Sequence, residues 1–267
     1  MEIARRTLER WLGGSEVTGA EAERTRIFRG GGRNLFSGLR GRLARADRHG
    51  KVLLVSMESG QGFLSRLGMT GKWVRRPAGE AVPYSRARLL LGDGTVVHYR
   101  DPRLFGLIEP HPADALQTLP AVRALGPDPL LTPLAGRQLR DALGATRVPI
   151  KLALMDQGRL AGLGNIHAAE ALWRAKIHPG RPTPTLTVPE WNRLATAIRK
   201  GLEFALAAED SEEIEYVEEP GTENPFRVYA RAGERCPRCG TIIRLLRQGG
   251  RRTDFCPHCQ PARRRAG

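Results

Sequence analysis

Two short cysteine motifs near the C-terminus, Cys236-Pro-Arg-Cys239 and Cys256-Pro-His-Cys259, decide how this part of the chain folds. Sixteen residues separate them, and the 267-residue chain has no other cysteine. Each Cys-x-x-Cys motif offers two thiolates, so the pair suits one tetrahedral zinc ion in a closed structural site. Disulfides and redox-active pairs are the alternatives. The polar start of the chain, MEIARRTLER, favours a reducing compartment and therefore zinc.

The sequence between the two motifs predicts a β-hairpin. An apolar run at 242–246 is followed by the turn signal Gln248-Gly249-Gly250, and Thr253 to Phe255 can return as a second strand. The whole segment therefore reads as a zinc ribbon. Arginines near its tip, among them Arg251 and Arg252, suit contacts with phosphates or with a groove. A solvated basic face on a protein-binding ribbon is the alternative.

The composition of the whole chain points to a polyanionic partner. The 43 Lys and Arg residues exceed the 28 Asp and Glu residues, which gives a formal charge of +15. Such an excess makes attraction to phosphates strong and salt-sensitive. An anionic membrane surface would attract the same charge, but the sequence contains neither an amphipathic anchor nor a run of about 20 apolar residues. We therefore expect no membrane partner.

The order of the expected elements indicates an α+β chain. Residues 1–14 carry a helical apolar stripe that ends at Gly13-Gly14. Short strands separated by Gly and Asp-Gly turns follow over 24–110 and predict an antiparallel sandwich or barrel. The expected strands are RIFRG, LRGRLARADRHG, KVLLVSM, GFLSRLGM, GKWVRR, ARLLLGDG, TVVHYRD and LFGLIEP. After a Pro-rich passage the pattern is helical from about 134 to 208.

Between two helical stretches stands Gly162-Leu163-Gly164-Asn165. A tight turn followed by a helix that begins near Asn165 would present backbone N–H groups and a short polar side chain to a phosphate. Lys151, about one helix upstream, can supply a positive charge. Taken alone, the Gly-x-Gly pattern is weak, and an ordinary helical turn is the better reading of it.

Several long motifs, in this order, resemble the bacterial formamidopyrimidine-DNA glycosylases and their endonuclease VIII relatives. The resemblance covers nearly the whole chain. The matching stretches are IARRTLERWL, the strand from Gly50 to Leu54, the loops Leu67–Gly71 and Asp101–Gly106, IKLALMDQGRLAGLGNIHAAEALWRAKIHP, and VYARAGERCPRCG to RRTDFCPHCQ. It implies an N-terminal antiparallel β-sandwich with a helix (1–120), a helix-two-turn-helix domain (121–225) and a β-hairpin zinc ribbon (226–262).

The resemblance also implies roles for single residues. Lys51 and Arg251 would take part in catalysis, Arg251 at the phosphate next to the lesion. The implied DNA-binding residues are Met69, Tyr84, Arg103, Phe105, Arg147, Lys151 and Asn165. Met69, Arg103 and Phe105 would fill the space left by a flipped base, as apolar wedges do elsewhere. Without the family, a solvated charge is the better reading of Lys51, and a core position is the better reading of Phe105.

The activity that the resemblance implies is base-excision repair. A damaged nucleotide would be flipped out of double-stranded DNA into a pocket. An oxidised purine, of the formamidopyrimidine or 8-oxoguanine type, would be removed, and an abasic-site lyase step would cut the backbone. One structural Zn²⁺ is the expected cofactor. We expect a monomer in the bacterial cytoplasm, associated with the nucleoid.

The chain departs from the family at its start. The family reads Met-Pro-Glu-Leu-Pro-Glu-Val-Glu, with the proline amine as nucleophile, whereas this chain begins Met1-Glu2-Ile3-Ala4. Either a GTG valine codon has been taken as the start, or the protein binds damaged DNA without chemistry. A zinc-ribbon protein that binds RNA or a protein partner is a third class. An acidic segment at 209–219 also replaces the family's lesion-covering loop, which leaves lesion preference open.

Overall fold

The computed structural model describes residues 1–29, 32–208, 213–214, 216–217, 219 and 221–262. The chain forms two compact units. One comprises Met1–Ala124 with Glu209–Thr222, and the other comprises Leu125–Ala208 with Glu223–Gly267. Part of the acidic segment predicted at 209–219 lies outside the described residues. Within the described residues, no helix is long and apolar enough to cross a membrane.

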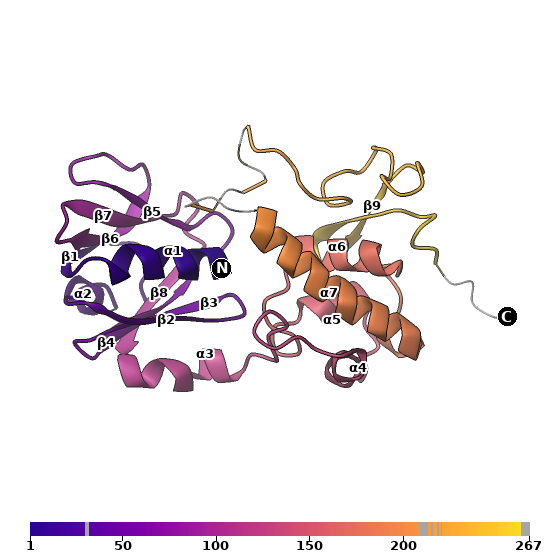
Figure 1. Cartoon of the computed structure of the whole chain (residues 1–267), viewed down its shortest axis with the longest axis horizontal. Coiled ribbons are helices and arrows are strands. Elements are labelled where there is room, and N and C mark those ends of the chain that lie inside the picture. The colour runs from indigo at the N-terminus through magenta and orange to yellow at the C-terminus, as the bar shows by residue number, and fades with distance from the viewer. Residues whose placement is uncertain (30–31, 209–212, 215, 218, 220, 263–267) are drawn as a thin grey trace. The chain divides into compact units, whose positions relative to one another are not determined.

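The first unit is a β-sandwich covered by short helices (Figure 1). Its elements are α1 (Glu2–Gly13), β1 (Val17–Ala22), α2 (Gly32–Ser37), β2 (Leu43–His49), β3 (Val52–Met57), β4 (Gln61–Arg66), β5 (Lys72–Pro77), β6 (Ser85–Leu91), β7 (Thr95–Arg100), β8 (Leu107–Pro112), the 3₁₀ helix η1 (Ala113–Thr118) and α3 (Pro120–Arg123). One sheet has the order β1-β6-β7-β5 and the other β2-β3-β4-β8, and all their pairings are antiparallel.

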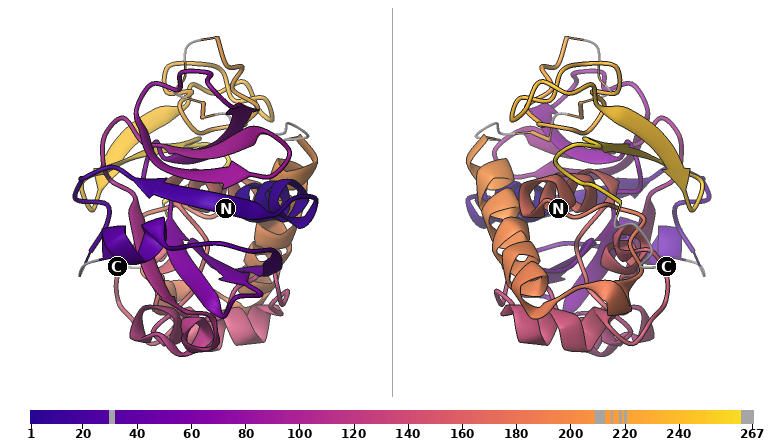
Figure 2. Two further views of the ribbon diagram at one scale, coloured as in Figure 1. Left: turned by 90° about the vertical axis from the view of Figure 1, so that its left-hand side faces the viewer. Right: turned by 90° about the vertical axis from the view of Figure 1, so that its right-hand side faces the viewer.

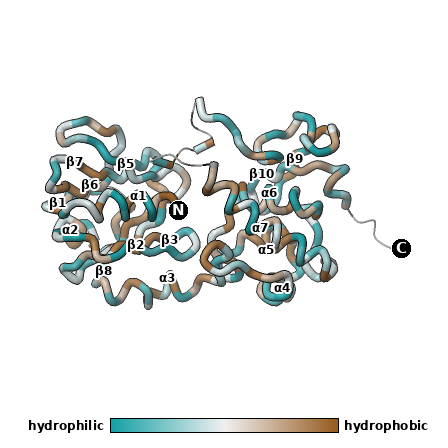
Figure 3. Tube along the Cα trace, viewed as in Figure 1, coloured by the Kyte–Doolittle hydropathy of each residue, from teal (hydrophilic) through white to brown (hydrophobic). Residues whose placement is uncertain are grey.

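The two sheets enclose one apolar core. Strand residues such as Phe63, Trp73 and Tyr99 are buried in it, and their rings lie in contact. Helix α1 adds Leu8 and Leu12 to the same core, because residues four apart lie on one helix face. Figure 3 shows hydrophobic positions along these strands and hydrophilic positions in many of the connecting turns. The expected sandwich with a helix is therefore confirmed.

Two details of the expected strand order are wrong. Residues 26–29, the described part of RIFRG, form no strand: Phe28 makes a single bridge with Ile108, and the buried Ile27 contributes to the core without a ladder. Conversely, β1 was not expected, because VTGAEA lacks a run of β-branched or aromatic residues. It pairs with β6, and a Cβ on Gly19 would lie 2.7 Å from Leu90 Cδ1, so a larger residue there would have to displace the end of the Leu90 side chain.

The second unit is helical and ends in a hairpin. Its elements are α4 (Gly136–Leu143), α5 (Ile150–Met155), α6 (Asn165–Ala175), the 3₁₀ helix η2 (Thr183–Thr185), α7 (Val188–Ala208), β9 (Arg244–Gln248) and β10 (Arg251–Phe255). Helices α4, α5, α6 and α7 share an apolar core around Trp191, Leu172 and Leu154. The yellow hairpin β9–β10 is seen in the right-hand view of Figure 2.

The start of α7 follows from its sequence. Thr187 precedes the helix and Glu190 is its third residue, which is the spacing of a capping box. The Glu190 carboxylate accepts hydrogen bonds from the Thr187 N–H and hydroxyl, and it also pairs with the buried Arg181. Burial would raise the pKa of Glu190, but these hydrogen bonds outweigh it and lower the pKa to about 2. The carboxylate therefore stays ionised and keeps α7 anchored.

Candidate nucleic-acid interface and metal centre

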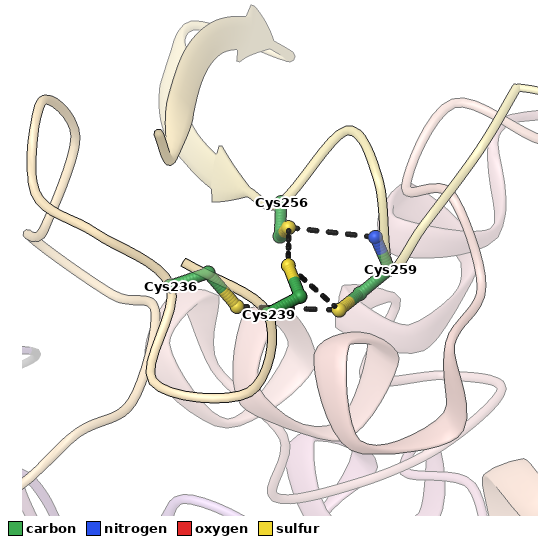
Figure 4. Close-up of side chains that lie close together, drawn as sticks. All are labelled: Cys236, Cys239, Cys256 and Cys259. Atoms are coloured by element: carbon green, nitrogen blue, oxygen red, sulfur yellow. Dashed lines mark hydrogen bonds between the residues drawn. The ribbon is translucent and has the colours of Figure 1, made fainter. Parts of the chain in front are cut away.

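The four cysteines converge on one point in the second unit (Figure 4). Their Sγ atoms all lie within 4.8 Å of one another, and the Sγ–Sγ distances include 4.0 Å for Cys236–Cys259 and 3.5 Å for Cys239–Cys256. Four thiolates about 2.3 Å from one tetrahedral zinc ion would be about 3.8 Å apart. The cluster therefore has the dimensions of a zinc site, as the spacing of the motifs predicts.

The metal site is tied to the end of α6 by two side chains. Buried Gln260 accepts a hydrogen bond from the Cys256 N–H at 3.0 Å and donates one to the Ile177 carbonyl at 2.9 Å. Arg238 lies between Cys236 and Cys239. Its guanidinium is 4.0 Å from the centre of the Trp173 ring and donates a hydrogen bond to the Trp173 carbonyl. The ordering of the ribbon is thus coupled to the helical core.

Lys151, a predicted DNA-binding residue, is completely buried. Its Nζ donates to Asn165 Oδ1 at 2.6 Å, to the Arg252 carbonyl at 2.9 Å and to Thr253 Oγ1 at 2.5 Å. These three bonds use all three hydrogens of the ammonium. Desolvation lowers its pKa to about 8, with Asp254 opposing the shift and Arg251 adding to it. Lys151 therefore joins Asn165 to the hairpin, and a contact between Lys151 and a phosphate stays a prediction.

Asn165 gains its orientation from this contact. Asn165 is the half-buried first residue of α6, and its Oδ1 accepts the hydrogen bond from Lys151. The amide NH₂ of Asn165 therefore remains as a donor. The free N–H groups of a helix start point the same way. Binding of a phosphate by Asn165 and the start of α6 stays a prediction.

The hairpin tip separates the two neighbouring arginines. Gly249 and Gly250 both have positive φ, 54° and 72°, which matches the two-residue turn that suits a right-twisted hairpin. Arg252 pairs with Asp254 at 2.8 Å, whereas the exposed Arg251 has no ion pair in the part of the chain that the structure describes. Arg251 is thus the arginine with a guanidinium available to a ligand.

Two loops of the first unit lie directly against each other. One carries Met69 and the other carries Arg103 and Phe105. A Cβ on Gly68 would lie 2.6 Å from the Phe105 carbonyl carbon, so the backbones meet where only glycine fits. Met69 is 60% exposed and Phe105 is 48% exposed, although both are large and apolar. The core alternative for Phe105 is therefore wrong, and the loops present an apolar pair to solvent.

Asp101 holds both loops, a role that sequence reasoning missed. The carboxylate is buried; it accepts bonds from the Gly106 N–H at 2.8 Å and the Arg103 N–H at 3.3 Å, and from the Thr70 hydroxyl at 3.3 Å. Arg26 adds bonds to the Arg103 and Leu104 carbonyls. Asp101 begins the matching loop Asp101–Gly106, but only the burial of its carboxylate distinguishes it from an ordinary acidic loop residue.

Tyr84 lies at the same end of the sandwich. Its carbonyl accepts the Asp101 N–H at 3.0 Å, its φ is positive at 62°, and its side chain is 53% exposed. The ring is flanked by the guanidinium groups of Arg86 and Arg100 at 5.7 and 5.9 Å. The ring thus lies near two cations, and donation by its hydroxyl to a phosphate stays a prediction.

Lys51 occupies the β2–β3 turn and is exposed. The turn is braced from α1: buried Arg48 donates to the Gly50 carbonyl at 3.2 Å and to Glu2 at 2.9 Å. Burial would raise the pKa of Glu2, but hydrogen bonds from Arg5, Arg48 and Arg6 lower it to about 2. The Glu2 carboxylate thus has a positioning role and fixes the strand end that carries Lys51.

The described part of the acidic segment is bound to β5. Glu219 pairs with Lys72 at 3.0 Å, Glu213 pairs with Arg76, and the Tyr216 hydroxyl donates to the Gly71 carbonyl at 2.7 Å. Gly71 ends the loop that carries Met69. Two of the acidic charges are therefore neutralised next to this loop, which the sequence did not predict.

The predicted site residues thus fall into two groups and two single positions. Met69, Tyr84, Arg103 and Phe105 are joined through Asp101, and Lys151 and Asn165 are joined directly, with Arg251 one residue from their partner Arg252. Lys51 stands in its own turn, and Arg147 is exposed in the connection between α4 and α5. The first group offers apolar wedges with cations, and the second offers donors for phosphate oxygens.

Comparison with known families covers most of the chain. The model of the formamidopyrimidine-DNA glycosylase N-terminal domain matches residues 1–108, and that of the formamidopyrimidine-DNA glycosylase H2TH domain matches residues 125–215. A zinc finger found in FPG and IleRS matches residues 233–262. Together with the converging Sγ atoms, this match identifies the four cysteines as one structural zinc site.

Individual relatives agree with the family match. Formamidopyrimidine-DNA glycosylase of Geobacter metallireducens is 37% identical over 265 residues, which are 97% of each chain. The crystal structure of the MutM (FPG) protein from Thermus thermophilus matches with a TM-score of 0.81 at 33% identity and covers 97% of this chain and 96% of its own. The complex between Lactococcus lactis FPG (MutM) and a Fapy-dG containing DNA has a TM-score of 0.87 at 29% identity, with 98% of each chain covered.

Proposed function

Because this chain belongs to the formamidopyrimidine-DNA glycosylase family, we propose that it removes oxidised purines from double-stranded DNA and cleaves the backbone at the resulting abasic site. The observation that carries the proposal is the exposed pair Met69 and Phe105, held on adjoining loops by the carboxylate of Asp101. Exposed apolar side chains on rigid loops are the tool that proteins use to part stacked bases.

Base removal begins with flipping of the damaged nucleotide. Unstacking costs a few kcal/mol, and the cost is least where damage has weakened the pair. Met69 and Phe105 would enter the space left behind, and the Arg103 guanidinium, 4.7 Å from the centre of the Phe105 ring, would face the opposite strand's polar edges. This interaction is made only after flipping, so it favours the extrahelical state.

Phosphate contacts would fix the backbone on either side of the flipped nucleotide. The Asn165 amide, the Arg251 guanidinium, the Tyr84 hydroxyl and Arg147 are the donors we assign to this role. None of them reads a base sequence, which suits an enzyme that must search all DNA for damage. We assign Lys151 to positioning of Asn165 and the hairpin. The modules at 1–120, 121–225 and 226–262 are proposed to act together as a monomer.

The chemical step needs an amine that attacks the sugar C1′, displaces the base and forms a Schiff base. The resemblance described above implies that this amine belongs to an N-terminal proline and that Lys51 assists it. Glu2 is not available as the acid partner, because its carboxylate is engaged by Arg5, Arg6 and Arg48. The second candidate remains a protein that binds damaged DNA without chemistry.

Borohydride trapping separates the two candidates. The printed chain and a version that begins Met-Pro-Glu-Leu-Pro-Glu-Val would be incubated with an 8-oxoguanine duplex and reduced. Cross-linking by the extended version alone supports glycosylase and lyase activity with a proline nucleophile. Cross-linking by both points to another amine, which the Lys51→Gln variant would test.

Absence of cross-linking has its own meaning. If neither version traps 8-oxoguanine, formamidopyrimidine or abasic duplexes, yet both bind an abasic-site analogue, the activity is refuted and the binding protein is supported. If duplex DNA fails to bind at modest salt, both candidates are refuted, and an RNA-binding or protein-binding role follows.

A further inference from the structure

A second cationic site lies in the helical unit, in a hollow of about 410 Å³ between α6 and α7. The α6–α7 hollow is lined by Arg174, Asn192, Arg193, Thr196, Ala197 and Lys200. Five of these residues belong to α7 at spacings of one, four, five and eight, so they share one face of the helix. Arg174 approaches from α6. The lining thus contains three cations, two neutral polar side chains and no carboxylate.

These cations differ from other basic residues in the helices of the same unit. Arg199, one position before Lys200, pairs with Glu203 at 3.2 Å, and Arg137 on α4 pairs with Asp141. By contrast, Arg174, Arg193 and Lys200 form no ion pair within the residues that the structure describes. Three like charges that converge without a counter-charge repel one another, which is a cost to the fold in the absence of an anion.

Arg174 carries a further sign of a missing partner. Its guanidinium lies 5.3 Å from the centre of the Phe204 ring, which fixes the side chain over the end of α7. Its Nε is buried and has no hydrogen-bond acceptor among the described residues. A buried donor without an acceptor is uncommon in native proteins, because its desolvation is not compensated. The Arg174 guanidinium is thus a cation that the described part of the protein does not neutralise.

The end of α6 explains only part of the arrangement. A helix C-terminus carries about half a negative charge, which attracts cations, and Arg193 Nε donates to the Ala175 carbonyl at 3.4 Å. The three cations nevertheless leave an excess of more than two positive charges in the hollow. The hollow is also distinct from the start of α6: nine residues separate Asn165 from Arg174, or about 13 Å along the helix.

We propose that the α6–α7 hollow binds a small ligand of the pyrophosphate class, with two linked phosphoryl groups. Such an anion matches the surplus charge, and the Arg174 fork suits its oxygens in a bidentate contact. Asn192 adds a neutral donor at the rim, whereas the Thr196 hydroxyl already donates to the Asn192 carbonyl at 3.0 Å, and Ala197 leaves room at the floor. A backbone phosphate of DNA shares the chemistry of one phosphoryl group and is the competing source.

Calorimetric titration of the zinc-loaded full chain with pyrophosphate at low salt tests the proposal. We expect one saturable site, weakened about tenfold by Arg174→Gln and by Lys200→Gln, because each removes one charge-assisted contact. Lys200 is exposed, so its variant keeps the fold if Arg174→Gln does not. The matched control is Arg199→Gln, which lies on the same helix outside the hollow and should bind pyrophosphate like the parent chain.

Two results would overturn the proposal. One is pyrophosphate binding that is absent, or that all three variants weaken equally, since this would show general attraction to a basic protein. The other is displacement of pyrophosphate by an undamaged duplex together with a matching loss of duplex affinity in Lys200→Gln, since the hollow would then be a DNA contact. Unchanged duplex affinity in Lys200→Gln, with pyrophosphate binding lost, supports a separate small-molecule site.

Discussion

Replacing Lys151 with methionine is expected to loosen the link between the start of α6 and the zinc ribbon. The change keeps the length of the side chain and removes the donor. Asn165 Oδ1, the Arg252 carbonyl and Thr253 Oγ1 would each lose the hydrogen bond that they accept from Nζ. The hairpin and the proposed phosphate contact would then no longer share a common anchor.

The size of the effect follows from two opposing contributions. Three lost bonds from a charged donor remove about 1.5 kcal/mol each at the lower limit, or about 4–5 kcal/mol in all. The variant no longer buries an ammonium group, and this offsets about 3 kcal/mol of the loss, because desolvation lowers the pKa of Lys151 from 10.5 to about 8. The free energy of unfolding should therefore fall by about 1–2 kcal/mol at pH 7.

The pH dependence gives a sharper test. The unfolded chain keeps the Lys151 proton up to about pH 10.5, whereas the folded chain releases it above about pH 8. Between these values the unfolded state binds more protons, so the stability of the parent protein gains from this group as pH rises. Lys151→Met lacks this gain, and the difference between parent and variant should grow from pH 8 to pH 10.

Urea unfolding of the zinc-loaded proteins at several pH values would measure the difference, and amide hydrogen exchange at Thr253 and Asp254 would locate it. Lys200→Met is the matched control, because it makes the same change at an exposed helix position. Equal stability of Lys151→Met and the parent across this pH range, with equal affinity for an abasic-site duplex, would refute the reasoning.

Four further outcomes follow from the site. Asp101→Asn should weaken binding to an abasic-site duplex at least tenfold, measured by fluorescence anisotropy, because Gly106 N–H loses an ionised acceptor; unchanged affinity would contradict the loop assignment. Glu2→Gln should be less stable than the parent by on the order of 3 kcal/mol above about pH 4.5, and the two should converge as pH falls toward 2, where the parent loses its lowered-pKa carboxylate; parallel acid-unfolding curves would exclude this ion cluster. Removal of zinc by a chelator should disorder the ribbon and reduce duplex affinity, as seen by hydrogen exchange and anisotropy, and full affinity after verified zinc loss would count against a role for the ribbon. Arg251→Gln should reduce DNA binding without loss of stability, whereas Arg252→Gln should destabilise the hairpin by leaving Asp254 buried and unpaired; the reverse pattern would exchange their roles.

The zinc ribbon was predictable because its determinants are local. Cysteine spacing reports metal geometry, and the turn at Gly249-Gly250 has the backbone conformation that two glycines in sequence indicate. The sandwich was predictable from strands with regular turns, but β1 was not, since its place in the sheet is set by its ladder with the distant β6 and not by its own strand propensity.

The candidate site was less accessible to the sequence, because its key contacts join distant positions. Lys151 carried the signature of a phosphate ligand, yet its partners Arg252 and Thr253 lie about 100 residues away and bury it. The choice between Arg251 and Arg252 likewise depends on which one reaches Asp254. Asp101 looked like an ordinary loop residue until two loops were found around its carboxylate.

The shared carboxylate of Asp101 has a consequence for how this protein can diverge. One side chain satisfies the Gly106 N–H of one loop and the Thr70 hydroxyl of the other, and Gly68 allows the two backbones to touch. A change in either loop therefore alters the surroundings of the other. Positions 68, 70, 101 and 106 should covary as one block among descendants of this chain, so that the wedge residues are inherited as a matched pair.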